Sequence, residues 1–319
     1  MKFLEDITKK PAIFQRTVGL TKEEFQKYIQ QLESVWEEAE KLRKTRDDRQ
    51  RAIGAGRSYK LLSLEHKLLV ILLYYKAYFT QEFIGLIVGL DQGNVSRLIQ
   101  KMMPLLEKVA DKELATYLAQ AKEEYEKTPA SQRVNNWKDF IKVHSDLKDV
   151  ATDATEQSIY RSSDDETQKA HYSGKKKRHT IKTQISASKS GRILDVSGSY
   201  PGSVHDAKIA DDEQTVRKFP EDTCQRFDSG YQGINSKNPD HYIITPTKKP
   251  RGGELSPLEK ELNTVHSKRR IRIEHALSRI KKFKICSHTY RGSVKKYNTV
   301  FRGVAAFVNF KWANTAAAA

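Results

Sequence analysis

The sequence is poor in cysteine and has no long apolar run. Its two cysteines, Cys224 and Cys286, lack the spacing of a metal site or of a disulfide scaffold. The longest apolar run, residues 68–75, is far shorter than the roughly 20 residues that a membrane span needs. The first ten residues contain acids and no apolar core, unlike a signal peptide. We therefore expect a reduced, cytoplasmic protein without a membrane partner.

Positive charge is what the chain has in excess. Lysine and arginine number 57 against 40 aspartates and glutamates, a net charge of +17. This excess predicts a polyanionic partner, with a membrane surface as the weaker alternative. The apolar fraction of 38% permits a buried core, and 319 residues can form two domains or one large one.

The composition changes along the chain. Residues 21 to about 128 have helical periodicity, interrupted by a basic, glycine-bearing connector at 46–60. From about residue 150 short β-rich runs alternate with turns. The predicted boundaries are an N-terminal helix and connector at 1–60, a helical domain at 61–130, a linker at 131–150, a strand-rich domain at 151–312 and a tail at 313–319.

The helical part contains the pattern of a helix-turn-helix. Thr80 can cap a short helix that stops at Gly89, Asp91 can cap the next, and Gly85 is the small residue where the two cross. The second helix of this motif enters the major groove of DNA, whereas an ordinary helical hairpin is the alternative. Its outward polar residues, which can hydrogen-bond bases or phosphates, are Gln92, Asn94, Ser96, Arg97 and Gln100.

The strand-rich part has the order of a ribonuclease-H-like fold. Strands are predicted at 149–161, 179–188 and 191–200, then a helix at 205–219 and a strand within 223–233. This order is typical of an α/β domain with a mixed five-stranded sheet and flanking helices. The first and fourth strands of that fold are neighbours, so Asp153 and Asp228 are expected to meet at one edge of the sheet.

A capped helix at 256–265 and a separate helix around Glu274 are predicted to follow. Glu274 is the single acid among six lysines and arginines in residues 270–284. On a helical projection, Arg270, Glu274 and Lys281 share one narrow stripe beside the apolar face. Taken alone, an i, i+4 ion pair between Arg270 and Glu274 explains the pattern.

Together these motifs resemble those of DDE transposases of bacterial insertion sequences, in the group called insertion-sequence family five, which is related to Harbinger-type transposases. The group's second acidic motif, Asp-x-Gly-Tyr, matches residues 228–231, and its third, Tyr-x2-Arg-x3-Glu-x6-Lys, matches Arg270, Glu274 and Lys281. The tyrosine position of the third motif is Ser267 here. The likeness covers about residues 50–312.

The resemblance implies an enzyme that binds the terminal inverted repeats of its element through the helix-turn-helix and cuts and joins DNA strands. Asp153, Asp228 and Glu274 would be the catalytic metal ligands. They would hold two Mg²⁺ ions, which Mn²⁺ can replace, because hard cations take oxygen ligands.

The expected partners are double-stranded DNA, as element ends and as target, and further copies of the chain in a homodimer or larger assembly. The protein would lie in the bacterial cytoplasm at the nucleoid. A domesticated transposase that only regulates DNA, and a stand-alone nuclease, are the alternatives.

Other residues are candidates for supporting roles. Asp206 competes with Asp228 for the metal, although capping of a helix explains it adequately. His205 can orient water or phosphate or be structural, and Tyr231 can contact a base or sugar or pack in the core. Arg270 and Lys281 would face phosphates. Basic residues that can neutralise phosphate, or simply be solvated, are Lys175, Lys176, Lys177, Arg178, Lys248 and Lys249.

Overall fold

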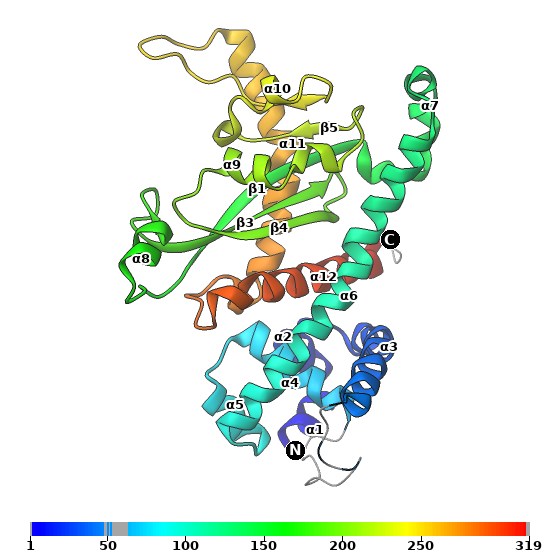
Figure 1. The fold of residues 1–319 in the computed structure, drawn as a ribbon, viewed down its shortest axis with the longest axis vertical. Coiled ribbons are helices and arrows are strands. Elements are labelled where there is room, and N and C mark those ends of the chain that lie inside the picture. The colour runs from blue at the N-terminus through cyan, green and yellow to red at the C-terminus, as the bar shows by residue number, and fades with distance from the viewer. Residues whose placement is uncertain (1, 48–49, 51, 53–62, 317–319) are drawn as a thin grey trace. The chain divides into compact units, whose positions relative to one another are not determined.

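The computed structural model describes residues 2–47, 50, 52 and 63–316 (Figure 1). They divide into two compact units. The helical unit comprises Met1–Asp111, Lys282–Cys286 and Thr299–Ala319, and the sheet unit comprises Lys112–Lys281 and Ser287–Asn298. The basic connector expected at 46–60 lies mostly outside the described residues. The domain boundaries expected from the sequence stay a prediction.

The helical unit is built around an almost wholly buried helix. Residues 68–75, the longest apolar run, lie in α4 and are all buried. The helices of this unit are α1 (Lys2–Thr8), α2 (Pro11–Val18), α3 (Lys22–Thr45), α4 (Leu64–Ala77), α5 (Gln81–Val88), the first part of α6 (Gln92–Lys127), the 3-10 helix η4 (Lys284–Cys286) and most of α12 (Tyr297–Ala316). Within the described ranges, no helix combines the length and the apolar character needed to cross a bilayer.

The expected helix-turn-helix is formed by α5 and the start of α6. The Thr80 hydroxyl accepts from the Phe83 amide at 3.3 Å, and Asp91 Oδ1 accepts from the Asn94 amide at 2.9 Å. Between them Gly89 ends α5 with a φ of +72°, a backbone conformation that favours glycine. A Cβ on Gly85 would collide with the carbonyl oxygen of Leu90, so the tight crossing requires glycine there.

Replacing Gly85 by alanine should therefore destabilise the helical unit. The added methyl group has no space against rigid backbone, and we expect a loss of about 2 kcal/mol in the free energy of unfolding. Urea unfolding followed by circular dichroism measures this loss. Gly93→Ala is the matched control, because its methyl group meets only side-chain atoms and alanine favours a helix. Equal stability of Gly85→Ala and wild type would contradict the crossing.

The sheet unit contains a six-stranded mixed sheet in the expected α/β fold. Strand order is β2–β3–β1–β5–β6, with β4 paired to β3. The bounds are β1 (Asp149–Ser158), β2 (Tyr172–Ser173), β3 (Arg178–Ser188), β4 (Ile193–Pro201), β5 (Cys224–Arg226) and β6 (Ile243–Ile244). Strand β3 runs antiparallel to β1, β2 and β4, whereas β5 runs parallel to β1 and β6 runs parallel to β5. The expected five-stranded sheet is thus extended by the two-residue strand β2.

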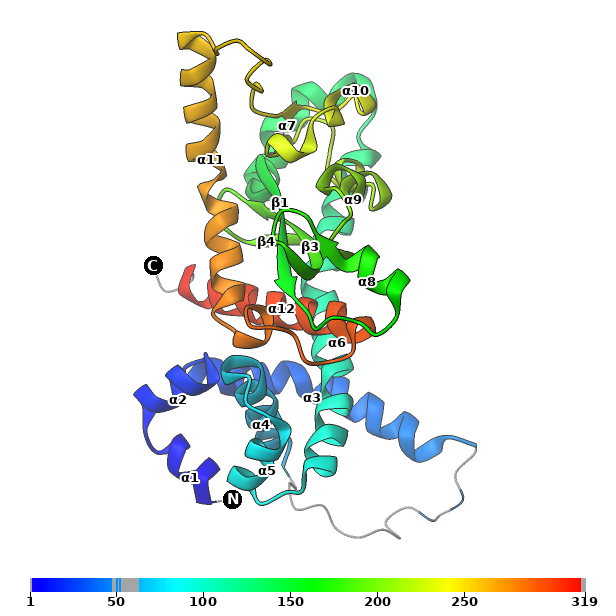
Figure 2. The ribbon, with the colours of Figure 1, turned by 90° about the vertical axis from the view of Figure 1, so that its left-hand side faces the viewer.

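Helices flank the sheet on both sides (Figure 2). Successive side chains of β1 point to opposite faces of the sheet, so the residues on each face contact different helices. Val150 packs with Leu118 of α6 on one face, whereas Asp149 lies near Arg269 of α11 on the other. The remaining elements of this unit are α7 (Ala130–Val143), η1 (Ser145–Leu147), α8 (Asp165–His171), α9 (Asp206–Asp212), η2 (Thr215–Lys218), η3 (Ser229–Tyr231), α10 (Ile234–Lys237), α11 (Pro257–Lys281) and η5 (Val294–Lys296).

The expectation of two helices at 256–265 and around Glu274 was wrong, since α11 runs unbroken from Pro257 to Lys281. Ser256 and Glu259 form a reciprocal cap at its start, with bonds of 2.8 and 3.2 Å. No glycine or proline interrupts the residues that follow, so nothing in the backbone ends the helix at 265. His266, the next residue of the helix, is buried and anchors it to the rest of the sheet unit. Its Nε2 donates to the Phe227 carbonyl oxygen at 2.8 Å.

Candidate active site

Two of the predicted acids are brought together by parallel strand pairing. In the register of β1 and β5, Ala151 lies beside Arg226. Asp153 and Asp228 each lie two residues further along their own segments, so they reach the same level at the carboxyl end of β5. The neighbourhood of Asp228 is fixed by His266, which bonds to the preceding residue. The expectation that the first and fourth predicted strands are neighbours is thereby confirmed.

The Asp153 carboxyl group is mostly buried and only partly compensated. Its Oδ1 accepts from the Ala154 amide at 2.8 Å, and its Oδ2 lies 3.4 Å from Arg270 Nη2. Burial raises the pKa of Asp153 to about 6, with the negative charges of Asp228 and Asp206 adding to the rise and Arg270 opposing it. An acid with such a pKa lies where a further cation would be stabilised.

Helix α11 presents the predicted stripe to Asp153. Arg270 contacts that carboxylate directly. Burial lowers the pKa of Lys281, the nearby Lys176 lowers it further, and Asp153 acts in the opposite direction. Glu274 lies between these two cations on the same stripe. Its side chain is exposed, and the described residues give it no hydrogen bond or ion pair.

These acids fit a divalent cation in their chemistry. Carboxylate oxygens suit Mg²⁺, and a dication would compensate the charge that raises the pKa of Asp153. In the described part of the chain, however, no three acids, histidines or cysteines are close enough together to hold a metal ion. The assignment of Asp153, Asp228 and Glu274 as metal ligands stays a prediction.

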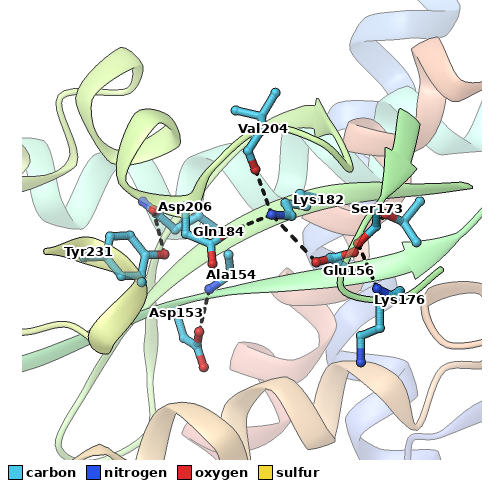
Figure 3. Close-up of polar contacts among 12 residues, drawn as sticks. Asp153, Ala154, Glu156, Ser173, Lys176, Lys182, Gln184, Val204, Asp206 and Tyr231 are labelled. Carbon is cyan, nitrogen blue, oxygen red and sulfur yellow. Dashed lines mark hydrogen bonds and ion pairs between the residues drawn. The ribbon is translucent and has the colours of Figure 1, made fainter. Parts of the chain in front are cut away.

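Asp206 lies close to this site without capping its helix. The N-cap residue of α9 is the exposed His205, whose side chain makes no capping bond. Asp206 is the first helical residue, and its Oδ1 lies 3.0 Å from Lys182 Nζ. The capping role expected for Asp206 was wrong, because a lysine from β3 takes up its carboxylate (Figure 3).

Tyr231 is a core residue. Its ring is fully buried, and its hydroxyl donates to Gln184 Oε1 at 3.0 Å (Figure 3). Burial raises the pKa of Tyr231 well above its ordinary value, and Asp206, Asp153 and Asp228 raise it further. A direct contact with a base or sugar is not open to a ring in this position, so the packing alternative applies.

The predicted DNA-contacting residues lie on the surface of their own units. In the helical unit Gln92, Asn94, Arg97 and Gln100 are exposed and Ser96 is half-buried. Arg97 Nη2 donates to Asn94 Oδ1 at 2.9 Å, which links two residues of the exposed polar face of α6. In the sheet unit the predicted basic residues are all exposed, namely Lys175, Lys176, Lys177, Arg178, Lys248 and Lys249.

A buried network beside the site was missed by the sequence reasoning. Lys182 of β3 contacts both Asp206 and Glu156, and Gln184 bonds Thr215 as well as Tyr231. The signal was present in residues 179–188, where a lysine and a glutamine occupy alternate positions of a central strand. Charged and amide side chains at such positions are rare unless they have partners.

Comparison with known proteins gives two matches to family models and one relative. Residues 152–309 match the model described as DDE superfamily endonuclease, and residues 59–111 match the helix-turn-helix of DDE superfamily endonucleases. The chain is also similar to the "Probable transposase for insertion sequence element IS702" of Microchaete diplosiphon. The two are 29% identical over 258 residues, which cover 81% of this chain and 84% of that protein. No solved structure matches the chain.

Asp153→Asn should stabilise the protein above pH 6 in the absence of divalent cations. A carboxyl whose pKa is raised on folding contributes stability below its unfolded pKa, near 4, and loses it as the pH passes 6. The asparagine amide cannot ionise. Relative to wild type, the free energy of unfolding of the variant should therefore be about 2 kcal/mol higher at pH 8 than at pH 4. Urea unfolding in EDTA at both pH values tests this.

The exposed Asp240 supplies the control, since Asp240→Asn should show no such pH-dependent gain. An Asp153→Asn variant whose stability follows that of wild type at every pH would contradict the buried environment of this carboxyl group.

Proposed function

Because the chain belongs to the DDE superfamily of endonucleases, we propose that it is a transposase that binds the terminal inverted repeats of its element and cleaves and transfers DNA strands. The observation that carries the proposal is the parallel pairing of β1 with β5. This pairing brings Asp153 and Asp228 to the same height along the sheet, and Arg270 of α11 contacts Asp153 there. The helix-turn-helix is the element that would bind the repeats, with α6 in the major groove. Two ends must be cut together, so the working form is a homodimer or larger.

In this mechanism Asp153, Asp228 and Glu274 would hold two Mg²⁺ ions, which supply an activated water and neutralise the developing charge on the phosphate when they are bound. Arg270 and Lys281 attract the scissile phosphate to the same face of α11 and offset its charge. After hydrolysis the freed 3′-hydroxyl is the nucleophile toward the target strand. Mn²⁺ is expected to replace Mg²⁺, since both take oxygen ligands.

A DNA-binding regulator without catalysis is the second candidate. It is favoured by the exposed position of Glu274, which contacts neither aspartate in the described structure. Against it stands the burial of Asp153, which weakens the fold at neutral pH and brings no benefit to a protein that only binds DNA.

Removing any of the three proposed ligands should abolish cleavage of the cognate element end. We expect Asp153→Asn, Asp228→Asn and Glu274→Gln each to lower the cleavage rate about 100-fold or more, because each deletes an ionic ligand worth several kcal/mol. A Mg²⁺-dependent cleavage and strand-transfer assay measures the rates, and retained binding of the end shows that the variants are folded.

Full cleavage by Glu274→Gln would refute the enzymatic proposal. Asp206→Asn belongs in the same series: complete loss with it, but not with Asp228→Asn, would exchange the roles of these two acids. Cleavage without joining would indicate a stand-alone nuclease.

The basic segment at 175–177 should supply phosphate contacts. Replacing Lys175, Lys176 and Lys177 together by glutamine is expected to reduce the slope of log K against log[salt] by about 2 to 3, roughly 0.9 for each lost contact. Titration of element-end DNA at several salt concentrations measures the slope. Replacement of Lys9 and Lys10, in the turn between α1 and α2, together with Lys27 on α3, is the charge-matched control. Equal slopes in both triple variants would show that residues 175–177 are solvated and do not contact phosphates.

A further inference from the structure

We propose that Lys182 is a positioning residue of the cleavage site, which holds Asp206 and the adjoining segment with His205 next to Asp228. The inference rests on the proposed function and adds to it a residue outside the acidic motifs. Lys182 touches no reacting atom in this role. It acts through the carboxylate that it binds.

Lys182 is held from three directions. Its side chain is only 10% exposed, although lysine is rarely buried without partners. Its Nζ donates to the Val204 carbonyl oxygen at 2.7 Å and to Asp206 Oδ1 at 3.0 Å, and lies 3.7 Å from Glu156 Oε1. These contacts join β1, β3 and the start of α9 (Figure 3).

Glu156 anchors the ammonium group to the sheet. It pairs in register with Lys182 across β1 and β3, so both side chains point to the same face. The Thr180 hydroxyl donates to Glu156 Oε2 at 2.9 Å, which leaves Oε1 for the lysine. Two carboxylates thus share one cation, and its loss would leave both without a positive partner in a shielded position.

The segment before α9 is fastened to β3 at a second point. The Gly202 amide donates to the Thr180 carbonyl oxygen at 2.9 Å. A Cβ at Gly202 would collide with the Thr180 hydroxyl, so only glycine allows this approach. From there the chain reaches Val204 and Asp206, both bonded to Lys182. The lysine therefore fixes the free end of a segment whose other end is already attached.

The second oxygen of Asp206 is directed to the site. A Cβ built on Gly230 would lie 3.3 Å from Asp206 Oδ2 and 3.0 Å from Asp228 Oδ1. The two carboxylates therefore converge on one glycine, whose amide donates to Asp228 Oδ1 at 2.8 Å. With Oδ1 of Asp206 held by Lys182, its Oδ2 remains toward Asp228, where it can accept a hydrogen bond from a water and so orient it.

The experiment compares Lys182→Met, Asp206→Asn and the double variant with wild type. Lys218→Met is the matched control, because Lys218 also bridges two acids, Asp195 and Glu213, at 2.9 and 3.5 Å. Hydrogen–deuterium exchange of the peptide 202–210 reports the position of the segment without any assay of activity. Cleavage of the element end reports the consequence for catalysis, and thermal unfolding reports stability.

Lys182→Met should raise exchange in residues 202–210 on the order of tenfold while the β1 peptide is unchanged, as expected for a local opening. It should lower cleavage about tenfold in the wild-type background and less than about twofold in the Asp206→Asn background, the coupling expected of residues that act as one unit. Lys218→Met should leave exchange in 202–210 and cleavage at wild-type values.

Unchanged exchange in residues 202–210 would overturn the inference whatever the activity. A second contrary result is that Lys182→Met lowers cleavage by the same factor in the wild-type and Asp206→Asn backgrounds, in proportion to its loss of thermal stability. That result would show that Lys182 only stabilises the fold, and it would overturn the inference as well. Failure of the proposed function has a different signature: wild type and Asp228→Asn would then be equally inactive or equally active.

Discussion

The parallel pairing of β1 with β5 is the constraint on which the site depends. Parallel strands in register end at a common edge, so acids that are 75 positions apart in the chain arrive at one level. Antiparallel pairing would have carried one of them to the opposite end of the sheet. The buried bond from His266 to the Phe227 carbonyl then ties α11 to the same edge, and through it the stripe of Arg270.

Charge in the sheet unit is distributed by face. Alternation along β1 directs Asp153 to α11, where Arg270 and Lys281 lie, and directs Glu156 to the face of α9, where Lys182 lies. Each acidic position thus has a basic residue from a different element, although the whole chain carries a net charge of +17. Arg270 compensates the charge of Asp153 only in part, since burial still raises the pKa of that carboxyl group to about 6.

Much of this arrangement was predictable from local signals. Thr80, Gly89 and the period of the β-rich runs gave the helix-turn-helix and the order of the sheet, because caps, turns and alternation are encoded in neighbouring residues. The single helix α11 was not predicted, because the buried anchor of His266 is a tertiary contact. Lys182 was missed for a similar reason: its partners Asp206 and Glu156 lie 24 and 26 positions away, and only the fold brings them together.

The continuity of α11 sets how this sequence can vary in length. On one unbroken helix a single inserted or deleted residue between Arg270 and Lys281 would turn one of them about 100° away from the stripe. The segment between β6 and Pro257, in contrast, is not part of a regular element and can absorb such changes at little cost. In this fold the distance from Asp228 to Glu274 can therefore change without moving the stripe, whereas the steps of four and seven residues around Glu274 are held by the geometry of the helix.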